Sequence, residues 1–341
     1  MTADGWSIRA LADAMGRVPF ALRALPIPFR LSRPRLASSE QLRPDMLRVI
    51  RRAADLAVVA IYDDPVSQTA SLGMRMSSPK TALYTARRVG NIDAFRWHAV
   101  PTASFAALIG LDLDRAIVAG NGTDVKHIRP GPWPARPTVG MVSGAAPGRG
   151  IENLVTAARE IREEMRELRL LLWLVPTGPE SEDYLTRLRL SVAADSWIEI
   201  TSVDYAEISA ALSQATVLAV PHPPGAYMDV ALPVKVFDSM AAGRPLVITP
   251  RTETRDLVLR HAAGEVAGGD RPEDIATALV RVLNDEAAAR RMGEAARAAA
   301  VEQYDWPVVG ERLALEVLRR EGALSAAAVF SSSSGTGALN G

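Results

Sequence analysis

Lys235 and Asp238 are charged residues three positions apart, between Pro233 and Gly243. Proline favours the first turn of a helix and glycine its end, so the pattern predicts a helix over 234–242. Residues three apart share a helix face. The ammonium and the carboxylate should therefore lie together near the helix N-terminus, where a cation suits a diphosphate and a carboxylate suits ribose hydroxyls. An ordinary solvated salt bridge is the simpler alternative.

The elements around this helix place its N-terminus at the edge of a sheet where ligands bind. A buried strand over 215–221 precedes it, a loop from His222 to Asp229 leads into it, and a second buried strand over 245–249 follows. Open α/β sheets bind ligands at the carboxyl ends of their strands, and a helix N-terminus there suits phosphate. His222 and Asp229 are therefore candidate site residues.

A second candidate lies in a glycine-rich turn. Residues 138–144 form a predicted strand that ends at Gly144, and Pro147-Gly-Arg149-Gly then leads into a helix. Such loops let backbone N–H groups approach a phosphate. Gly144 and Arg149 are thus predicted to contact an anionic ligand, although a glycine-rich strand–helix turn is weak evidence by itself.

The stretch Pro233-Val-Lys235-Val-Phe-Asp238-Ser-Met-Ala-Ala-Gly243-Arg-Pro245 resembles the donor-site signature of the glycosyl transferases group 1 family. Residues 115–124 and 147–158 are similar to two further segments of that family. The resemblance implies an α/β protein with the GT-B fold, two Rossmann-like domains facing a cleft. It also implies a retaining, hexosyltransferase-type enzyme that uses a nucleotide-diphosphate sugar.

The resemblance assigns roles to several residues. Lys235 and Arg149 would neutralise the leaving diphosphate, and Asp238 would hold the ribose. His222 and Asp229 would line the sugar pocket. Val203 and Tyr205 lie in the loop that meets the base in the family, although a core role for them is equally open.

Two departures from the family pattern keep other functions open. Met141 stands at the usual arginine position of the diphosphate clamp. Many family members carry two glutamates eight residues apart. Val230 occupies the position of the earlier one in this chain, and Asp229 is the residue directly before it. A catalytically silent partner or activator subunit is therefore an alternative, as is a nucleotide-sugar epimerase on the same fold.

The N-terminal half offers Asp63 and Asp64, which follow a predicted strand over 55–62. Carboxylates at the carboxyl end of a strand predict an acceptor-side site, and a loop or helix cap is the alternative. His98 falls within a predicted strand and is expected to be structural. His127 and His261 are expected to be surface residues.

The domain prediction places an N-terminal acceptor-side domain at 1–132 and a donor domain at 133–322, separated at a proline-rich linker. The final helix, at about 305–320, would cross back to the first domain, and an Ala/Ser/Gly-rich tail at 323–341 would be disordered. The first domain is expected to be shortened and to lack its first strand, because the chain opens on Asp4-Gly5.

Composition excludes several classes of function. The chain has no cysteine, which excludes disulfides, thiol catalysis and Cys-ligated zinc. No His or carboxylate cluster has metal spacing, so we expect no metal or cofactor besides the nucleotide sugar as co-substrate. No apolar run is long enough to span a membrane and no signal peptide is visible, which favours a cytoplasmic protein.

Charge is unevenly distributed. Residues 1–132 carry 18 Lys and Arg against 11 Asp and Glu, and ten arginines lie within the first 52 residues. This bias predicts an anionic or lipid-linked acceptor and peripheral contact with the inner face of the membrane, rather than nucleic acid. An arginine-rich composition without function is the alternative.

Overall fold

The computed structural model describes residues 59–61, 97–108, 110–176 and 179–320. They form two α/β units, one from residues up to Gly120 together with Trp306 onward, and one from Asn121 to Asp305. The predicted absence of a first strand, the candidates Asp63 and Asp64, and the tail at 323–341 concern residues outside the described ones. Each unit is described by itself.

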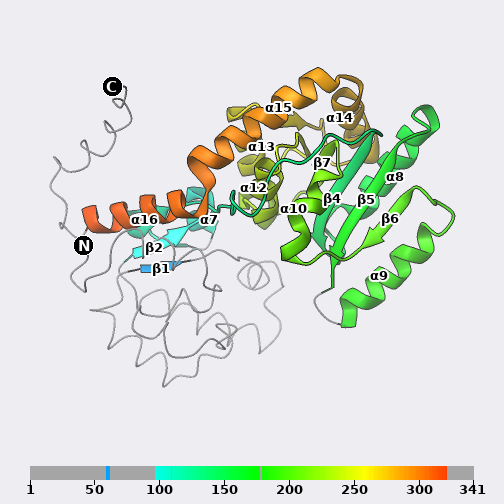
Figure 1. Cartoon of the computed structure of the whole chain (residues 1–341). Helices are drawn as coiled ribbons and strands as arrows, with labels where there is room; N and C mark the ends of the chain where they lie inside the picture. Colours follow the sequence, from blue (N-terminus) through cyan, green and yellow to red (C-terminus); the bar gives the residue numbers. More distant parts are fainter. Residues whose placement is uncertain (1–58, 62–96, 109, 177–178, 321–341) are drawn as a thin grey trace, which may run out of the picture. The chain divides into compact units, whose positions relative to one another are not determined.

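The first unit contains a parallel sheet in the order β1-β2-β3 (Figure 1). Its strands are β1 (Val59–Ile61), β2 (Trp97–Val100) and β3 (Ala116–Val118), with α7 (Ala103–Leu108), a 3₁₀ turn (Leu113–Arg115) and α16 (Trp306–Arg320) beside them. Arg312 of α16 donates to the carbonyl of Ala119 at 2.9 Å. His98 is buried in β2 with Nε2 3.2 Å from Arg115 Nη2, a structural role as predicted.

The second unit has a six-stranded parallel sheet in the order β6-β5-β4-β7-β8-β9 (Figure 1). The strands are β4 (Thr138–Gly144), β5 (Arg169–Val175), β6 (Ile198–Thr201), β7 (Val217–Val220), β8 (Leu246–Ile248) and β9 (Gly264–Val266). From β4 the chain winds outward to β6, then returns to the other side of β4 as β7. The strand order therefore reverses between β4 and β7, where open α/β sheets bind ligands.

Alternating side chains of the strands fill two cores, one on each face of this sheet. Met141 and Leu172 point to a core shared with α8 (Ile151–Glu164), α9 (Pro179–Ser191) and α14 (Pro272–Asn284). Trp173 and Leu218 point to the opposite core, shared with α10 (Ile208–Ser213), α12 (Val234–Ala241) and α13 (Thr252–Arg260). The remaining elements are a 3₁₀ turn (Tyr205–Glu207), α11 (Ala226–Val230), α15 (Glu286–Ala299) and a π-helical turn (Ala300–Tyr304).

The division between the units falls at Gly120, rather than at the predicted 132/133. Two arginine side chains, a buried Arg244 and a partly buried Arg297, explain the difference, because they fasten the segment after Gly120 to the second unit. Arg297 donates to the carbonyls of Val125 and Ile128, at 3.0 and 2.9 Å. Arg244 donates to the carbonyl of Pro132 at 2.6 Å. The proline-rich stretch is thus packed against the second unit, and α16 groups with the first.

Candidate functional site: a cationic edge of the second sheet

Lys235 is the second residue of α12, and its ammonium lies at the carboxyl end of β4. Pro233 precedes the helix in an extended conformation, with φ −69° and ψ 143°. The Nζ atom of Lys235 donates to Ser143 Oγ at 3.4 Å. Burial, and then the charge of Arg149, lower the pKa of Lys235 to about 7. The structure therefore brings the predicted pair Lys235 and Arg149 together.

The glycine-rich turn explains how Arg149 reaches this point. Gly150 has φ 77° and lies ahead of α8, and an added Cβ there would overlap the carbonyl oxygen of Pro221 at the end of β7. Only glycine allows both the left-handed conformation and that close approach. At Gly144 no atom lies within 4 Å of the Cβ position, so the end of β4 is open where the prediction places an anionic ligand.

Asp238 lies one turn after Lys235 and is bonded to a residue distant in sequence. Its Oδ1 accepts from Thr123 Oγ1 at 2.7 Å. Burial raises the pKa of Asp238 to about 7, against the opposing effects of the Thr123 bond and of His127. Asn121 donates from Nδ2 to the carbonyl of Leu232 at 2.7 Å. The Asn121–Asp124 turn thus holds both the start of α12 and its carboxylate.

Tyr205 presents a half-exposed ring near Asp238. Its ring stacks on His127 with centroids 4.9 Å apart and planes 27° apart, and 55% of Tyr205 is exposed. His127 Nε2 lies 2.7 Å from the Tyr205 carbonyl oxygen. Burial and then the charge of Asp238 raise the pKa of Tyr205 to about 12. Val203 packs against the core on the α12 face of the sheet, which favours the core role for Val203 over contact with the base.

The expectation for two histidines was wrong. His127 and His261 are both partly buried and bonded, rather than plain surface residues. His127 stacks on Tyr205, whereas His261 Nε2 lies 2.8 Å from the Tyr304 hydroxyl. Neither interaction could be read from the residues adjacent in sequence.

His222 and Asp229 lie on the segment between β7 and α12. His222 is 2% exposed, and its Nε2 has no hydrogen-bond partner among the described residues. Burial, followed by Lys235, Arg149 and Arg251, holds the pKa of His222 well below its usual value. Asp229 forms an ion pair with Arg251, Oδ1 to Nη1, at 3.0 Å. The predicted loop is in part a short helix, since Asp229 belongs to α11.

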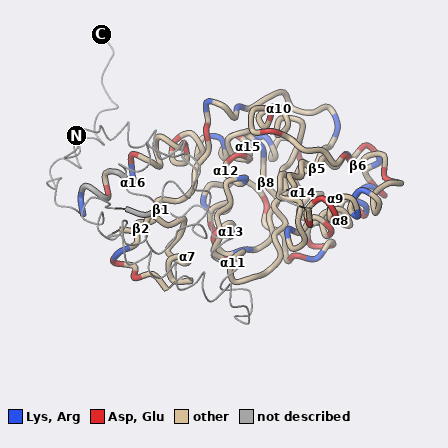
Figure 2. Tube along the Cα trace, turned by 90° about the horizontal axis from the view of Figure 1, so that it is seen from below, with Lys and Arg blue, Asp and Glu red and all other residues tan. Residues whose placement is uncertain are grey.

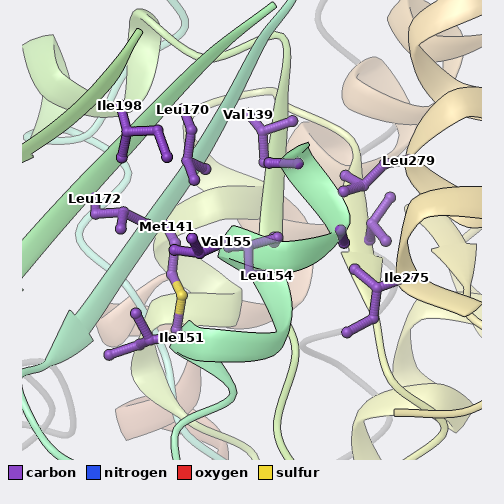
Figure 3. Close-up of a cluster of buried hydrophobic side chains, with 14 of the residues drawn as sticks. Val139, Met141, Ile151, Leu154, Val155, Leu170, Leu172, Ile198, Ile275 and Leu279 are labelled. Atoms are coloured by element: carbon purple, nitrogen blue, oxygen red, sulfur yellow. The ribbon is translucent and has the colours of Figure 1, made fainter. Parts of the chain in front are cut away.

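Met141 is a core residue and cannot be part of a diphosphate clamp. It is fully buried near Ile151, Val155 and Leu172, as Figure 3 shows. It lies three residues before the end of β4 and carries no charge, so it supplies nothing to a diphosphate clamp. The departure from the family pattern at this position therefore remains.

The arrangement concentrates positive charge. Neither Lys235 nor Arg149 has an ion-pair partner in the described parts of the chain. The charge of Arg149 raises the electrostatic cost of charging Lys235, and both cations oppose the charging of His222. In the same described parts, no group of His, Asp and Glu residues has the arrangement of a metal site. An unpaired cationic pair at the carboxyl ends of β4 and β7 can bind a diphosphate.

Three residues of this site escaped the sequence analysis: Thr123, Ser143 and Arg251. Thr123 lies within the Asn-Gly-Thr-Asp turn, whose similarity to the family was a usable signal. Ser143 ends a strand that was predicted correctly. Arg251 follows β8 without any local motif, so only the fold reveals its partner.

Residues 136–285 match the family model described as glycosyl transferases group 1. The chain is similar to this family over that segment. A GDP-mannose-dependent alpha-(1-6)-phosphatidylinositol monomannoside mannosyltransferase of Mycolicibacterium smegmatis is 30% identical over 182 residues, covering 52% of this chain and 47% of the relative. A phosphatidyl-myo-inositol mannosyltransferase of the same organism is 26% identical over 275 residues, covering 79% of this chain and 67% of the relative.

Solved structures of other proteins share the fold. Anabaena Alr3699/HepE in complex with UDP and glucose superposes with a TM-score of 0.64 at 15% identity, covering 82% of this chain and 76% of that chain. Sucrose-phosphate synthase from Thermosynechococcus elongatus superposes with a TM-score of 0.63 at 16% identity, covering 78% of this chain and 68% of that chain. The predicted α/β GT-B fold is confirmed. The chain spans about half the length of the first curated relatives it matches.

No helix in the described residues is both long and apolar enough to cross a membrane.

Proposed function

We propose that this glycosyltransferase group 1 chain transfers a hexose from a nucleoside-diphosphate sugar to an acceptor with retention. The observation that carries the proposal is the pairing of Lys235 and Arg149 at the switch point, with Asp238 one turn away. As the glycosidic bond breaks, negative charge develops on the leaving diphosphate. Two cations fixed in a partly buried site stabilise that charge more than they stabilise the ground state.

GDP-mannose is the first donor to test, because the curated relatives include GDP-mannose-dependent enzymes. UDP-glucose is the second, because a structural relative was solved with it. The relatives named for phosphatidylinositol acceptors support an anionic or lipid-linked acceptor. Peripheral association with the inner face of the membrane follows from such an acceptor and belongs to the same proposal.

Incubating the chain with each nucleotide sugar and a lipid extract tests the activity. We expect release of the nucleoside diphosphate that depends on the extract. NMR of the product should show the anomeric configuration of the donor. EDTA should leave the rate intact, because the described site offers no metal ligands in a cluster. Loss of turnover on chelation, restored by manganese, would contradict the proposal.

A silent partner subunit is the second candidate, favoured by the ion pair that occupies Asp229 and by Val230 in place of a glutamate. Such a subunit would bind the nucleotide without releasing sugar from it. An epimerase would instead produce a new nucleotide sugar with no acceptor present. The same incubation therefore separates the three functions.

A further inference from the structure

The connection between β8 and α13 holds the segment that carries His222 and Asp229. Three side chains, two from this connection and one from the first turn of α13, reach that segment: Thr249 Oγ1 donates to the His222 carbonyl at 2.5 Å, Arg251 Nη1 to Asp229 Oδ1 at 3.0 Å, and Thr254 Oγ1 to the Ala231 carbonyl at 3.2 Å. The two threonines fix the backbone at both ends. Arg251 alone fixes a side chain between them.

Arg251 is well placed to control Asp229. The side chain of Arg251 is 11% exposed, whereas that of Asp229 is 40% exposed. The buried arginine therefore orients a carboxylate that stays accessible to a ligand. The Nε atom of Arg251 and the Nε2 atom of His222 are buried and lack a partner among the described residues.

Charge matching in this site favours an uncharged sugar. Each phosphate of a nucleoside-diphosphate sugar carries one negative charge, and Lys235 and Arg149 supply one positive charge each when protonated. Arg251 is already paired with Asp229. Within the described part of the site, a carboxylate on the sugar would find no free cation and would face Asp229. Juxtaposed like charges are costly when partly desolvated.

We propose that Arg251 is the positioning residue for Asp229, and that the pair restricts the donor to a neutral hexose with hydroxyl groups, against a uronic acid. This inference rests on the proposed donor site. Asp229 accepts hydroxyl hydrogen bonds from the sugar, and Arg251 keeps its carboxylate oriented. The pair places a carboxylate at the sugar even though the sequence position of the family's earlier glutamate holds Val230.

The test compares nucleotide sugars that differ only in oxidation at the sugar's last carbon. UDP-glucose with UDP-glucuronate and GDP-mannose with GDP-mannuronate form such pairs, with UDP and GDP alone as references. Calorimetry on the wild-type chain should show the neutral sugar binding about tenfold or more tightly than the uronate. Asp229→Asn should reduce that ratio to about threefold or less, since it removes the repelling charge and keeps the shape.

Arg251→Gln should weaken binding of the neutral nucleotide sugar about tenfold while UDP or GDP binds as before. Arg251→Lys keeps the positive charge but lacks the planar guanidinium that can donate two hydrogen bonds at once. Its affinity for the neutral nucleotide sugar should lie between those of Arg251→Gln and the wild type. Arg255→Gln is the matched control, because Arg255 lies on the same helix and pairs with exposed Asp256. Thermal unfolding of each variant checks that α13 remains folded.

The outcomes distinguish failure of the proposed donor site from failure of the proposed role of Arg251 and Asp229. If neither UDP nor GDP binds the wild-type chain, the proposed donor site is wrong, and this inference fails with it. If a nucleoside diphosphate binds but the uronate binds as tightly as the neutral sugar, only the inference is overturned. An unchanged ratio in Asp229→Asn, or an unchanged affinity for the neutral nucleotide sugar in Arg251→Gln, would overturn it as well.

Discussion

Lys235 and Asp238 are opposite in charge, yet burial moves both side chains toward titration near neutral pH. Burial disfavours the charged form of each group, so the pKa of Lys235 falls to about 7 and that of Asp238 rises to about 7. Anions favour the ammonium form of Lys235. The free site is therefore incompletely charged at neutral pH, and a bound diphosphate completes it.

Proton uptake should accompany binding of the nucleotide sugar at pH 8. Lys235 is mostly neutral there in the free chain, and a bound diphosphate raises its pKa, so affinity should fall as pH rises from 7 to 9. Calorimetry in buffers of different ionisation enthalpy measures the proton count. A nucleotide sugar is the proper ligand, because the terminal phosphate of a free diphosphate titrates in this range. If the Lys235→Ala variant still takes up a proton on binding the nucleotide sugar, a group other than Lys235 is the one that is protonated.

Asp238 should distinguish the ribose from the phosphates. Asp238→Asn keeps an oxygen that can accept from Thr123 but removes the charge that favours ribose hydroxyls. We expect the affinity for UDP or GDP to fall about tenfold and that for inorganic pyrophosphate to change less than about twofold. Lys235→Ala should weaken both ligands. Equal losses for pyrophosphate and nucleotide in Asp238→Asn would contradict the ribose assignment.

Two turns at the scale of the elements position these side chains. The glycine-rich turn after β4 passes the end of β7 through Gly150, and the Asn121–Asp124 turn holds the start of α12. Since α8 and α12 cover opposite faces of the sheet, the crevice between β4 and β7 receives a helix N-terminus from each side. This geometry requires the glycine-rich turn after β4 to be tight.

A pair of glycine variants measures that requirement. Gly148 and Gly150 have φ of 75° and 77°, but only Gly150 has a backbone atom in the way of a Cβ. Gly148→Ala should cost about 1–2 kcal/mol of unfolding free energy from left-handed strain alone. Gly150→Ala should cost about 2 kcal/mol more, and it should weaken nucleotide binding because Arg149 moves. Equal unfolding midpoints for the two variants would argue against the close approach to Pro221.

The sequence was sufficient for the elements that carry strong local signals. Pro233 and Gly243 delimit α12 within a residue, and Gly243 has the left-handed φ of 66° that its position requires. Helix α11 was missed because it has five residues in a stretch rich in Pro and Gly, whose signals predict a loop. The burial of Met141 in the core was not predicted, because a motif alignment does not tell which face of a strand a residue occupies.

The side-chain pairs of the site were less accessible to sequence reasoning. Thr123 and Asp238 are 115 positions apart, and only the packing of the Asn121–Asp124 turn against α12 joins them. Arg251 lies directly ahead of α13, whereas Asp229 belongs to α11. Periodicity and spacing identify which residues can do chemistry, whereas partners distant in the chain depend on the fold.

Across the whole molecule, the described candidate residues all belong to the second unit, while the arginine-rich stretch before residue 53 lies outside the described residues. In the described part of the first unit, acidic and basic residues are interleaved along α16, as Figure 2 shows. Ion pairs link Arg319 and Arg320 to Glu316 at 2.7 Å. Any excess of basic charge facing a partner must therefore come from other segments.

Salt-dependent membrane binding tests this charge asymmetry. Residues 1–132 carry 18 basic against 11 acidic side chains, and each basic group near an anionic surface contributes about 1 kcal/mol within a Debye length. The chain should co-sediment with anionic vesicles at low salt and be released at high salt. Neutral vesicles provide the control. Equally low recovery with both kinds of vesicle at low salt would contradict membrane contact and favour a soluble acceptor.

The central claim is that the second unit binds a nucleoside diphosphate through Lys235, and a calorimetric titration of the chain with GDP and UDP tests it most directly. Lys235→Ala should weaken the binding of whichever nucleotide binds by about 1–3 kcal/mol, the free energy of a charge-assisted hydrogen bond. Lys126→Ala, at an exposed lysine, should bind as the wild type does. An affinity that is unchanged in Lys235→Ala would contradict the account.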